Sequence, residues 1–289
     1  MRGRLWFCRL DGPTIMYEEY WQLETKPFEN TGDMRFRYPA ASQQAALHKM
    51  RYAIESRRGA ALLAGPPGIG KSMLMETLRE QMDSAIGPFV QVVFPLMSSR
   101  DLLVYLAEQI GAPQADPPLN TVEESLRRLQ FFLEENNRNG QHSVLVVEEA
   151  HLLEDGGLLE TLRLLLNLKA GGSVAFTLLL LGQPSLLSSM QRYAALDDRI
   201  DIKMLLKPFT AEETAQYLEH RLTAAGSTRS IFIEESLPVV HQLSGGIPRR
   251  INRLCDLALV VGFAARLSTI DAAQLRAVSE ELVTIAPAA

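Results

Sequence analysis

The sequence predicts an α/β fold, in which a parallel sheet is covered by helices on both faces, followed by a domain made only of helices. Three observations predict it. Short continuous apolar runs, typical of strands buried on both faces, alternate with segments of helical periodicity over residues 43–206. The spacing leaves room for one helix between successive strands, which indicates parallel crossovers in a three-layer arrangement. After Pro208 the chain reads as helices without a convincing strand.

The expected elements follow from these patterns in chain order. Strands are predicted at 60–64, 89–94, 143–147, 174–181 and 200–206. Helices between them are predicted at 43–57, 73–82, 99–110, 121–137 and 158–168, and helices of the last domain at 211–225, 234–243, 248–265 and 271–282. Before the first helix, residues 17–40 mix aromatic residues with turn formers, so they are expected to form an irregular arm.

Composition and charge exclude several classes of protein. The 289 residues are 47% hydrophobic and 22% charged, as in a globular protein with a sizeable core. The net charge of −5 argues against a surface that binds nucleic acid throughout. Cys8 and Cys255 lie far apart in the chain, the histidines form no cluster, and no structural metal is expected. The longest apolar runs reach about half of the roughly 20 residues that span a bilayer, so no membrane span is expected.

The chain is organised around a glycine-rich loop between the first strand and its helix. Gly65, Gly70, Lys71 and Ser72 match the phosphate-binding pattern G-x-x-x-x-G-K-[ST], known as Walker A. Glycines let backbone N–H groups turn inward around phosphate oxygens, and the helix N-terminus adds its positive dipole end. Lys71 is expected to reach the β- and γ-phosphates, and the Ser72 hydroxyl to ligate Mg²⁺. The predicted nucleotide-binding residues are Gly65, Pro66, Pro67, Gly68, Ile69, Gly70, Lys71, Ser72 and Met73.

Two carboxylates follow the predicted strand 143–147, where a Walker B motif belongs. Ligands of open α/β sheets bind at the carboxyl ends of the strands, so Glu148 and Glu149 are expected near the loop. Glu148 would hold Mg²⁺, and Glu149 would act as the catalytic base toward water. The first acid of this motif is usually Asp, and Glu148 is one methylene longer. The sequence therefore predicts ATP and Mg²⁺ as the bound cofactors.

Three further polar residues are open to two interpretations. Gln183, after the strand 174–181, would point at the γ-phosphate or merely begin a turn between Gly182 and Pro184. Arg199 would be an arginine finger, a local ion-pair partner or a solvated side chain, and the residues alone do not choose. Arg249 lies in the first turn of a helix, where a positive charge opposes the dipole, which favours contact with an anion.

The ordered set of motifs resembles the AAA+ ATPases, and within them the ExeA/GspA-type ATPases of bacterial general secretion pathways. The resemblance is carried by the loop at 65–72, "VLVVEEAH" at 144–151, "LLLLGQP" at 178–184 and "SGGIPRRIN" at 244–252, with an arginine at 199. The segment "YWQLETKPFENTGDMRFRYPA" at 20–40 resembles the start of that family.

The resemblance implies a P-loop nucleotide-binding core with a helical lid and assigns roles within them. Residues 16–207 would be the α/β domain with its N-terminal arm, 208–285 the lid, and 1–15 a disordered extension or an artefact of start-codon choice. Gln183 would take the sensor-1 position and Arg249 the sensor-2 position. Arg199 would reach into a neighbouring subunit, which implies a homo-oligomeric ring, with a hexamer expected.

Three functions are consistent with the sequence. The leading hypothesis is an ATP hydrolase that assembles or remodels a partner in a secretion, pilus or cell-surface export complex, in the cytoplasm or at the inner membrane through that partner. The chain lacks the membrane span and peptidoglycan-binding region of longer secretion members, which favours a short cytosolic form. The alternatives are a transposition ATPase of the TniB/MuB kind that binds DNA, and a slow regulatory ATP-binding switch. DNA is less favoured because the arginine pairs 57–58, 127–128 and 249–250 are scattered.

Overall fold

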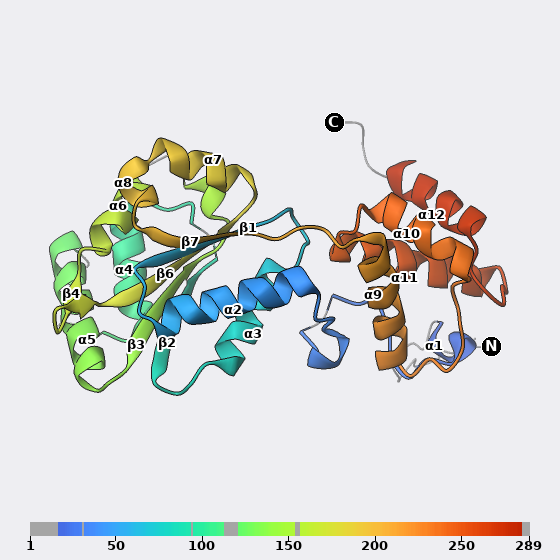
Figure 1. Ribbon diagram of the computed structural model, residues 1–289, viewed down its shortest axis with the longest axis horizontal. Helices are drawn as coiled ribbons and strands as arrows, with labels where there is room; N and C mark the ends of the chain where they lie inside the picture. The colour runs from blue at the N-terminus through green and yellow to red at the C-terminus, as the bar shows by residue number, and fades with distance from the viewer. Residues whose placement is uncertain (1–16, 31, 94, 113–120, 154–156, 285–289) are drawn as a thin grey trace, which may run out of the picture. The chain divides into compact units, whose positions relative to one another are not determined.

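The computed structural model describes residues 17–30, 32–93, 95–112, 121–153 and 157–284 (Figure 1). The chain divides into two compact units. One is Pro39–Pro208, and the other combines the described parts of Met1–Tyr38 and Phe209–Ala289. The predicted extension at residues 1–15 and the last residue of the predicted lid, residue 285, lie outside the described residues.

The first unit is built on a five-stranded parallel sheet. Its strands lie in the order β2-β3-β6-β1-β7. Their bounds are β1 Ala60–Ala64, β2 Ile86–Val92, β3 His142–Val147, β6 Phe176–Gly182 and β7 Ile200–Leu205. Because β3, β6 and β1 are neighbours, the segments that leave their carboxyl ends meet at one edge of the sheet. The loop at 65–70 leaves β1, the acids at 148–149 leave β3, and Gln183 leaves β6.

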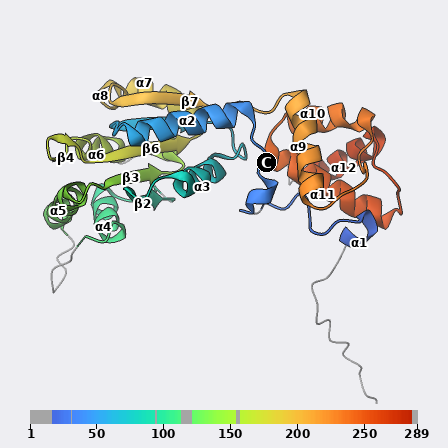
Figure 2. The same ribbon diagram turned by 60° about the horizontal axis from the view of Figure 1, so that its bottom comes forward.

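Helices cover both faces of the sheet, and alternate residues of each strand supply two separate cores. Helices α2 (Ala41–Glu55) and α3 (Lys71–Gln81) pack over Leu63, Val146 and Leu179. The opposite core joins Leu62, Leu145 and Leu178 to the remaining helices, which are α4 (Ser99–Gln109), α5 (Val122–Arg138), α6 (Leu158–Leu165), α7 (Ser185–Arg192) and α8 (Ala194–Asp197). Figure 2 shows these layers of the unit from a second direction. The predicted three-layer α/β class is confirmed.

The expected strand at 174–181 differs in detail. Two short strands, β4 (Lys169–Ala170) and β5 (Ser173–Val174), form an antiparallel hairpin, and β6 begins only at Phe176. Gly171 and Gly172 both have positive φ, which allows the tight turn between the hairpin strands. A short helix, η2 (Ala150–Leu152), also follows β3 directly.

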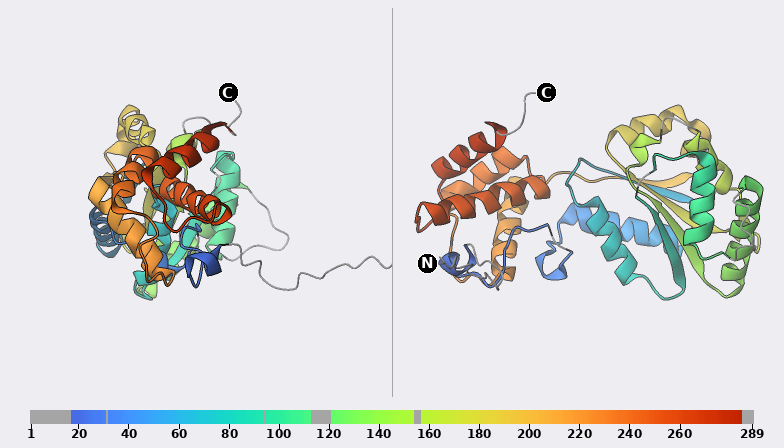
Figure 3. Two further views of the ribbon diagram at one scale, coloured as in Figure 1. Left: turned by 90° about the vertical axis from the view of Figure 1, so that its right-hand side faces the viewer. Right: turned by 180° about the vertical axis from the view of Figure 1, so that it is seen from behind.

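The second unit is helical, as expected for the lid. It contains α9 (Ala211–Ala224), η3 (Glu234–Ser236), α10 (Leu237–Ser244), α11 (Pro248–Ala264) and α12 (Ala272–Thr284). The bundle can be followed in the two views of Figure 3. A single parallel bridge joins Phe232 to Ile270. In the part of the chain that the structure describes, no helix is long and apolar enough to cross a membrane.

The N-terminal arm belongs to the helical unit, whereas the sequence placed it with the α/β domain. The arm includes α1 (Glu18–Trp21) and η1 (Met34–Phe36). The Trp21 indole donates to the Leu259 carbonyl at 2.9 Å. The buried Arg221 guanidinium donates to the carbonyls of Pro27 at 2.5 Å and Glu29 at 2.6 Å. These buried hydrogen bonds and the buried indole hold the arm on the helices, and its aromatic residues are explained by this packing.

Candidate nucleotide-binding site

The glycine-rich loop joins β1 to α3 in the geometry that a phosphate cradle needs. Residues 65–70 form the turn, and Lys71, Ser72 and Met73 open the helix. Gly68 and Gly70 have φ of 78° and 104°, a region that only glycine enters without strain. A Cβ on Gly65 would lie 3.0 Å from the Ile69 side chain, so this glycine permits the close packing of the loop.

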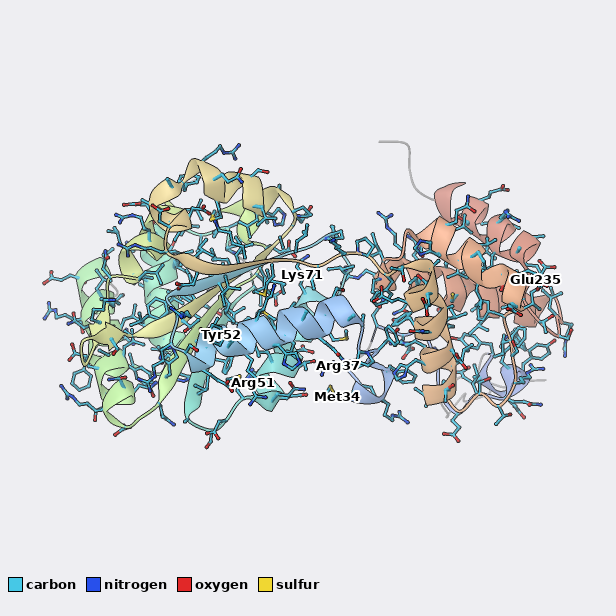
Figure 4. The ribbon with its side chains drawn as sticks, viewed as in Figure 1. Met34, Arg37, Arg51, Tyr52, Lys71 and Glu235 are labelled. Carbon is cyan, nitrogen blue, oxygen red and sulfur yellow. The ribbon has the colours of Figure 1, made fainter. Side chains whose placement is uncertain are left out.

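Lys71 lies across the loop, with its side chain largely buried. Its ammonium donates to the Gly65 carbonyl at 2.8 Å and the Pro66 carbonyl at 3.3 Å. Figure 4 labels Lys71 at the start of α3, next to the loop. The positive charge is therefore held by the loop's own backbone, at the helix N-terminus where an anion would bind.

A residue that sequence reasoning missed supports the loop from outside. Gln43, a buried residue of α2, donates its side-chain amide to the Ile69 carbonyl at 3.2 Å. This contact ties the loop to a helix packed on the same face of the sheet. A signal was present in the sequence, since Gln43 precedes Ala46, Leu47 and Met50 on the predicted apolar face at helical spacing.

Ser72 and Glu148 meet between the loop and the end of β3. The Ser72 hydroxyl donates to one carboxylate oxygen of Glu148 at 2.8 Å, and the Gln91 amide donates to the other at 2.5 Å. A hydroxyl and a carboxylate side by side are the oxygen ligands that Mg²⁺ takes beside nucleotide phosphates, so the donor set fits this ion. No group of three or more His, Cys, Asp or Glu is placed to hold a metal within the described residues.

Glu149 lies next to Glu148 on a left-handed backbone. Its φ is 47°, which is uncommon outside glycine and turns the chain sharply into η2. The Glu149 carboxylate is 3.4 Å from Nδ1 of His151, and the same nitrogen accepts the backbone N–H of Gln183 at 3.4 Å. His151 thus connects the ends of β3 and β6. His151 is the last residue of the motif "VLVVEEAH", but no role was predicted for it from the sequence.

Arg199 does not join this group. It precedes β7 at the amino edge of the sheet, and the register pairs Ala60 with Ile200. The loop begins five residues further along β1, about 17 Å away at roughly 3.3 Å per residue. The Arg199 guanidinium instead donates to the backbone carbonyl of Arg163 at 3.1 Å. Arg199 therefore lies too far along the strand to act on its own loop.

Arg249 belongs to the helical unit, where it is exposed in the first turn of α11, and its role as a sensor stays a prediction. The glycines that precede it are explained within that unit. Gly246 has a φ of 68°, and a Cβ there would lie 2.2 Å from the Phe209 carbonyl oxygen. Phe209 N–H also donates to the Gly246 carbonyl at 2.9 Å. Gly246 thus allows the start of the helical unit to pass against the turn before α11.

Comparison with known proteins identifies the family that this geometry fits. The model of the AAA domain matches residues 54–190, which include the loop, both acids and Gln183. General secretion pathway protein A of Aeromonas hydrophila is 32% identical over 253 residues. Residues 54–190 form an AAA domain. The match covers 86% of this chain and 45% of the relative, so the chain spans less than half of the curated relative's length.

Solved AAA+ structures share the fold at low identity. The ORC2 protein of Aeropyrum pernix has a TM-score of 0.66 at 17% identity, covering 89% of this chain and 72% of that chain. Drosophila ORC bound to DNA gives 0.65 at 15%, covering 98% and 70%. The RuvB Holliday junction branch migration motor of Thermotoga maritima gives 0.54 at 17%, covering 86% and 74%. At these identities the likeness shows the fold alone.

Proposed function

We propose that this AAA+ protein binds ATP with Mg²⁺ and hydrolyses it to drive the assembly or remodelling of a partner. The hydrogen bond between Ser72 and Glu148 carries the proposal, because it joins the phosphate-binding loop to the acid of the neighbouring motif. When bound, Mg²⁺ supplies positive charge to the β- and γ-phosphates of the nucleotide. Ser72 and Glu148 would hold the ion, and Lys71 would contact the phosphates.

Each of the remaining site residues has a separate proposed role in hydrolysis. Glu149 would accept a proton from the attacking water, and its partly exposed carboxylate lies 3.4 Å from Nδ1 of His151. Gln183, held through its backbone N–H at the end of the neighbouring strand, would position that water or the γ-phosphate. Arg249 would contact the γ-phosphate from the lid. Arg199, which lies too far from its own loop, would complete the site of a neighbouring subunit in a homo-oligomeric ring, for which we propose a hexamer.

The proposed client is a secretion, pilus or cell-surface export complex. The relative named general secretion pathway protein A supports this choice. We accordingly place the protein in the cytoplasm, or at the inner membrane through its partner. The slow regulatory switch is the limiting case of the same site, and a measured turnover rate separates the two.

DNA binding is the less favoured function, although two structural neighbours act on DNA by their names. Of the arginine pairs noted in the sequence, those of the α/β unit are engaged within the protein. Arg57 donates to Asn137, Arg58 to the Tyr52 hydroxyl, Arg127 to Glu123 and the buried Arg128 to the Ala112 carbonyl. Side chains used in this way do not form a basic stripe for a phosphate backbone.

The test combines nucleotide binding with a mobility shift on duplex DNA. We expect Mg²⁺·ATP binding and hydrolysis in the purified protein, and loss of nucleotide binding in Lys71→Ala. Lys49→Ala, which removes an exposed lysine of α2, serves as the matched control and should change neither. Unchanged affinity in Lys71→Ala would refute the site. An ATP-dependent shift of duplex DNA would favour the transposition function over the secretion function.

A further inference from the structure

The Glu148 carboxylate is held between two neutral donors that come from different elements. Ser72, at the start of α3, binds one oxygen at 2.8 Å, and Gln91, on β2, binds the other at 2.5 Å. The backbone of Glu148 is fixed as well, because its N–H donates to the Val92 carbonyl at 2.9 Å. The acid is largely buried, so these bonds replace the water that it has lost.

Sheet register explains why Gln91 reaches this carboxylate. Gln91 pairs with Val146 in the β2–β3 ladder, so the two side chains share a face of the sheet, and Glu148 lies two residues beyond Val146 on that same face. Val146 packs in the core formed with α2 and α3. The face of the sheet that carries Val146 is therefore the one on which Ser72 lies. The register of β2 and β3 therefore brings Gln91 and Glu148 together near the start of α3.

Of the two side chains that donate to Glu148, only Gln91 has no other expected role. The Ser72 hydroxyl has one proton, and its oxygen is also the expected ligand of the cation. Gln91 is not part of either core, and it is exposed. Core packing therefore does not account for an amide inside the otherwise apolar run of Phe89–Val93.

We infer that Gln91 is a positioning residue for the metal-holding carboxylate of Glu148, an inference that rests on the proposed function. Glu148 carries one methylene more than the Asp usual at this position, so its carboxylate has an additional rotatable bond. A hydrogen bond to the oxygen turned away from Ser72 restrains that freedom. Such outer partners orient metal ligands, and their loss typically weakens metal affinity about 10- to 100-fold.

The experiment follows the Mg²⁺ requirement of nucleotide binding rather than turnover. A fluorescent, non-hydrolysable ATP analogue is titrated against the protein at increasing MgCl₂, and again in EDTA. Gln91→Met keeps the length of the side chain and removes its amide. We expect the half-saturating Mg²⁺ concentration to rise about tenfold, while affinity for the analogue in EDTA changes by less than about twofold, since the loop itself is unaltered.

Two further variants separate positioning from a general structural effect. Gln130→Met is the matched control, because Gln130 on α5 is exposed and donates to Glu134 at 3.0 Å without contact to the site. We expect it to behave as the unaltered protein does. In a Glu148→Gln background, Gln91→Met should cause no additional loss, because a residue that acts only through Glu148 has nothing left to orient.

The outcomes distinguish the inference from the function on which it rests. An unchanged Mg²⁺ requirement in Gln91→Met, or an equal loss in the Glu148→Gln background, would overturn the role of Gln91. Failure of the unaltered protein to bind the analogue at any Mg²⁺ concentration would instead overturn the proposed function, and the inference with it. If Gln91→Met does not fold, Gln91→Asn, whose amide is one methylene short, carries the same expectation.

Discussion

The Glu149 carboxylate lies 3.4 Å from Nδ1 of His151, although the two residues leave β3 on a sharply turned backbone. The same imidazole nitrogen accepts the Gln183 N–H, so the ends of β3 and β6 are linked through one ring. Gly182 allows β6 to pass close to the segment after β3, since a Cβ there would lie 3.2 Å from the backbone nitrogen of His151 and 2.8 Å from the Leu186 side chain. The proposed base thus lies beside the ring that links the ends of β3 and β6.

Replacing Glu149 by Gln should leave ATP binding intact and reduce hydrolysis by at least about a hundredfold. The amide keeps the size of the side chain but cannot accept a proton from water, and general bases contribute roughly 10²–10⁴ in rate. Equilibrium binding of ATP and a single-turnover assay measure the two quantities separately. Glu135→Gln, at an exposed position of α5, is the control with the same change of charge. Hydrolysis at the normal rate in Glu149→Gln would show that another group is the base.

Arg199→Ala should reduce hydrolysis by about a thousandfold without weakening ATP binding to the altered subunit, as expected of an arginine finger supplied from a neighbour. Mixing offers the decisive measurement. Lys71→Ala subunits retain Arg199, and Arg199→Ala subunits retain an intact loop, so a mixture of these two inactive proteins should recover part of the activity. Arg127→Ala, which removes an exposed arginine paired with Glu123, is the control. Absence of recovery in the mixture would exclude action across subunits.

His142 should make the stability of the α/β unit depend on pH. Its Nε2 lies 2.9 Å from the Thr177 hydroxyl, which itself donates to the Arg58 carbonyl at 2.7 Å, so Nε2–H of the imidazole is the donor to the hydroxyl oxygen. Burial, and to a smaller extent the charge of Arg57, together lower the pKa of His142 to about 4. Protonation therefore favours the unfolded state, in which the pKa is near 6.5.

The expected result is a loss of unfolding free energy as pH falls from about 6.5 to about 4, reaching about 3 kcal/mol at the lower limit. Urea unfolding at several pH values measures it in the unaltered protein and in His142→Gln, whose amide cannot be protonated. The variant should lose less stability over this range. His48→Gln, at an exposed position of α2, should retain the full pH dependence. Equal slopes in His142→Gln and the unaltered protein would contradict the assignment.

Gly246→Ala should destabilise the helical unit by about 3 kcal/mol, combining the strain of a positive φ with a backbone clash. A Cβ at Gly246 would meet the Phe209 carbonyl at 2.2 Å, whereas Gly245 has a similar φ and no atom within 4 Å of such a Cβ. Gly245→Ala should therefore cost only about 1 kcal/mol from backbone strain. Thermal or urea unfolding of both variants checks the difference. Equal losses would show that the Phe209 contact relaxes without cost.

Much of the fold and part of the site could be predicted from short sequence patterns. The apolar runs of the strands, the phosphate-binding loop and the acids at 148–149 are each recognised from a pattern of residues a few positions apart. Their pattern therefore predicted the α/β class, and it predicted that the loop and the acids would gather at one edge. Gln43 and Gln91 were not predicted as site residues, because the partner of each lies far along the chain, 26 residues away for Gln43 and 57 for Gln91.

What the sequence by itself determined is therefore the phosphate-binding loop and the alternation of strands and helices, both set by residues close along the chain. Only the tertiary structure decided which unit receives the N-terminal arm, because the carbonyls of Pro27 and Glu29 find their donor in Arg221, nearly two hundred residues away. It also placed Arg199 at the opposite edge of the sheet from its own loop, through the pairing of β7 with β1. Contacts between distant segments depend on strand order and register, which no local pattern encodes.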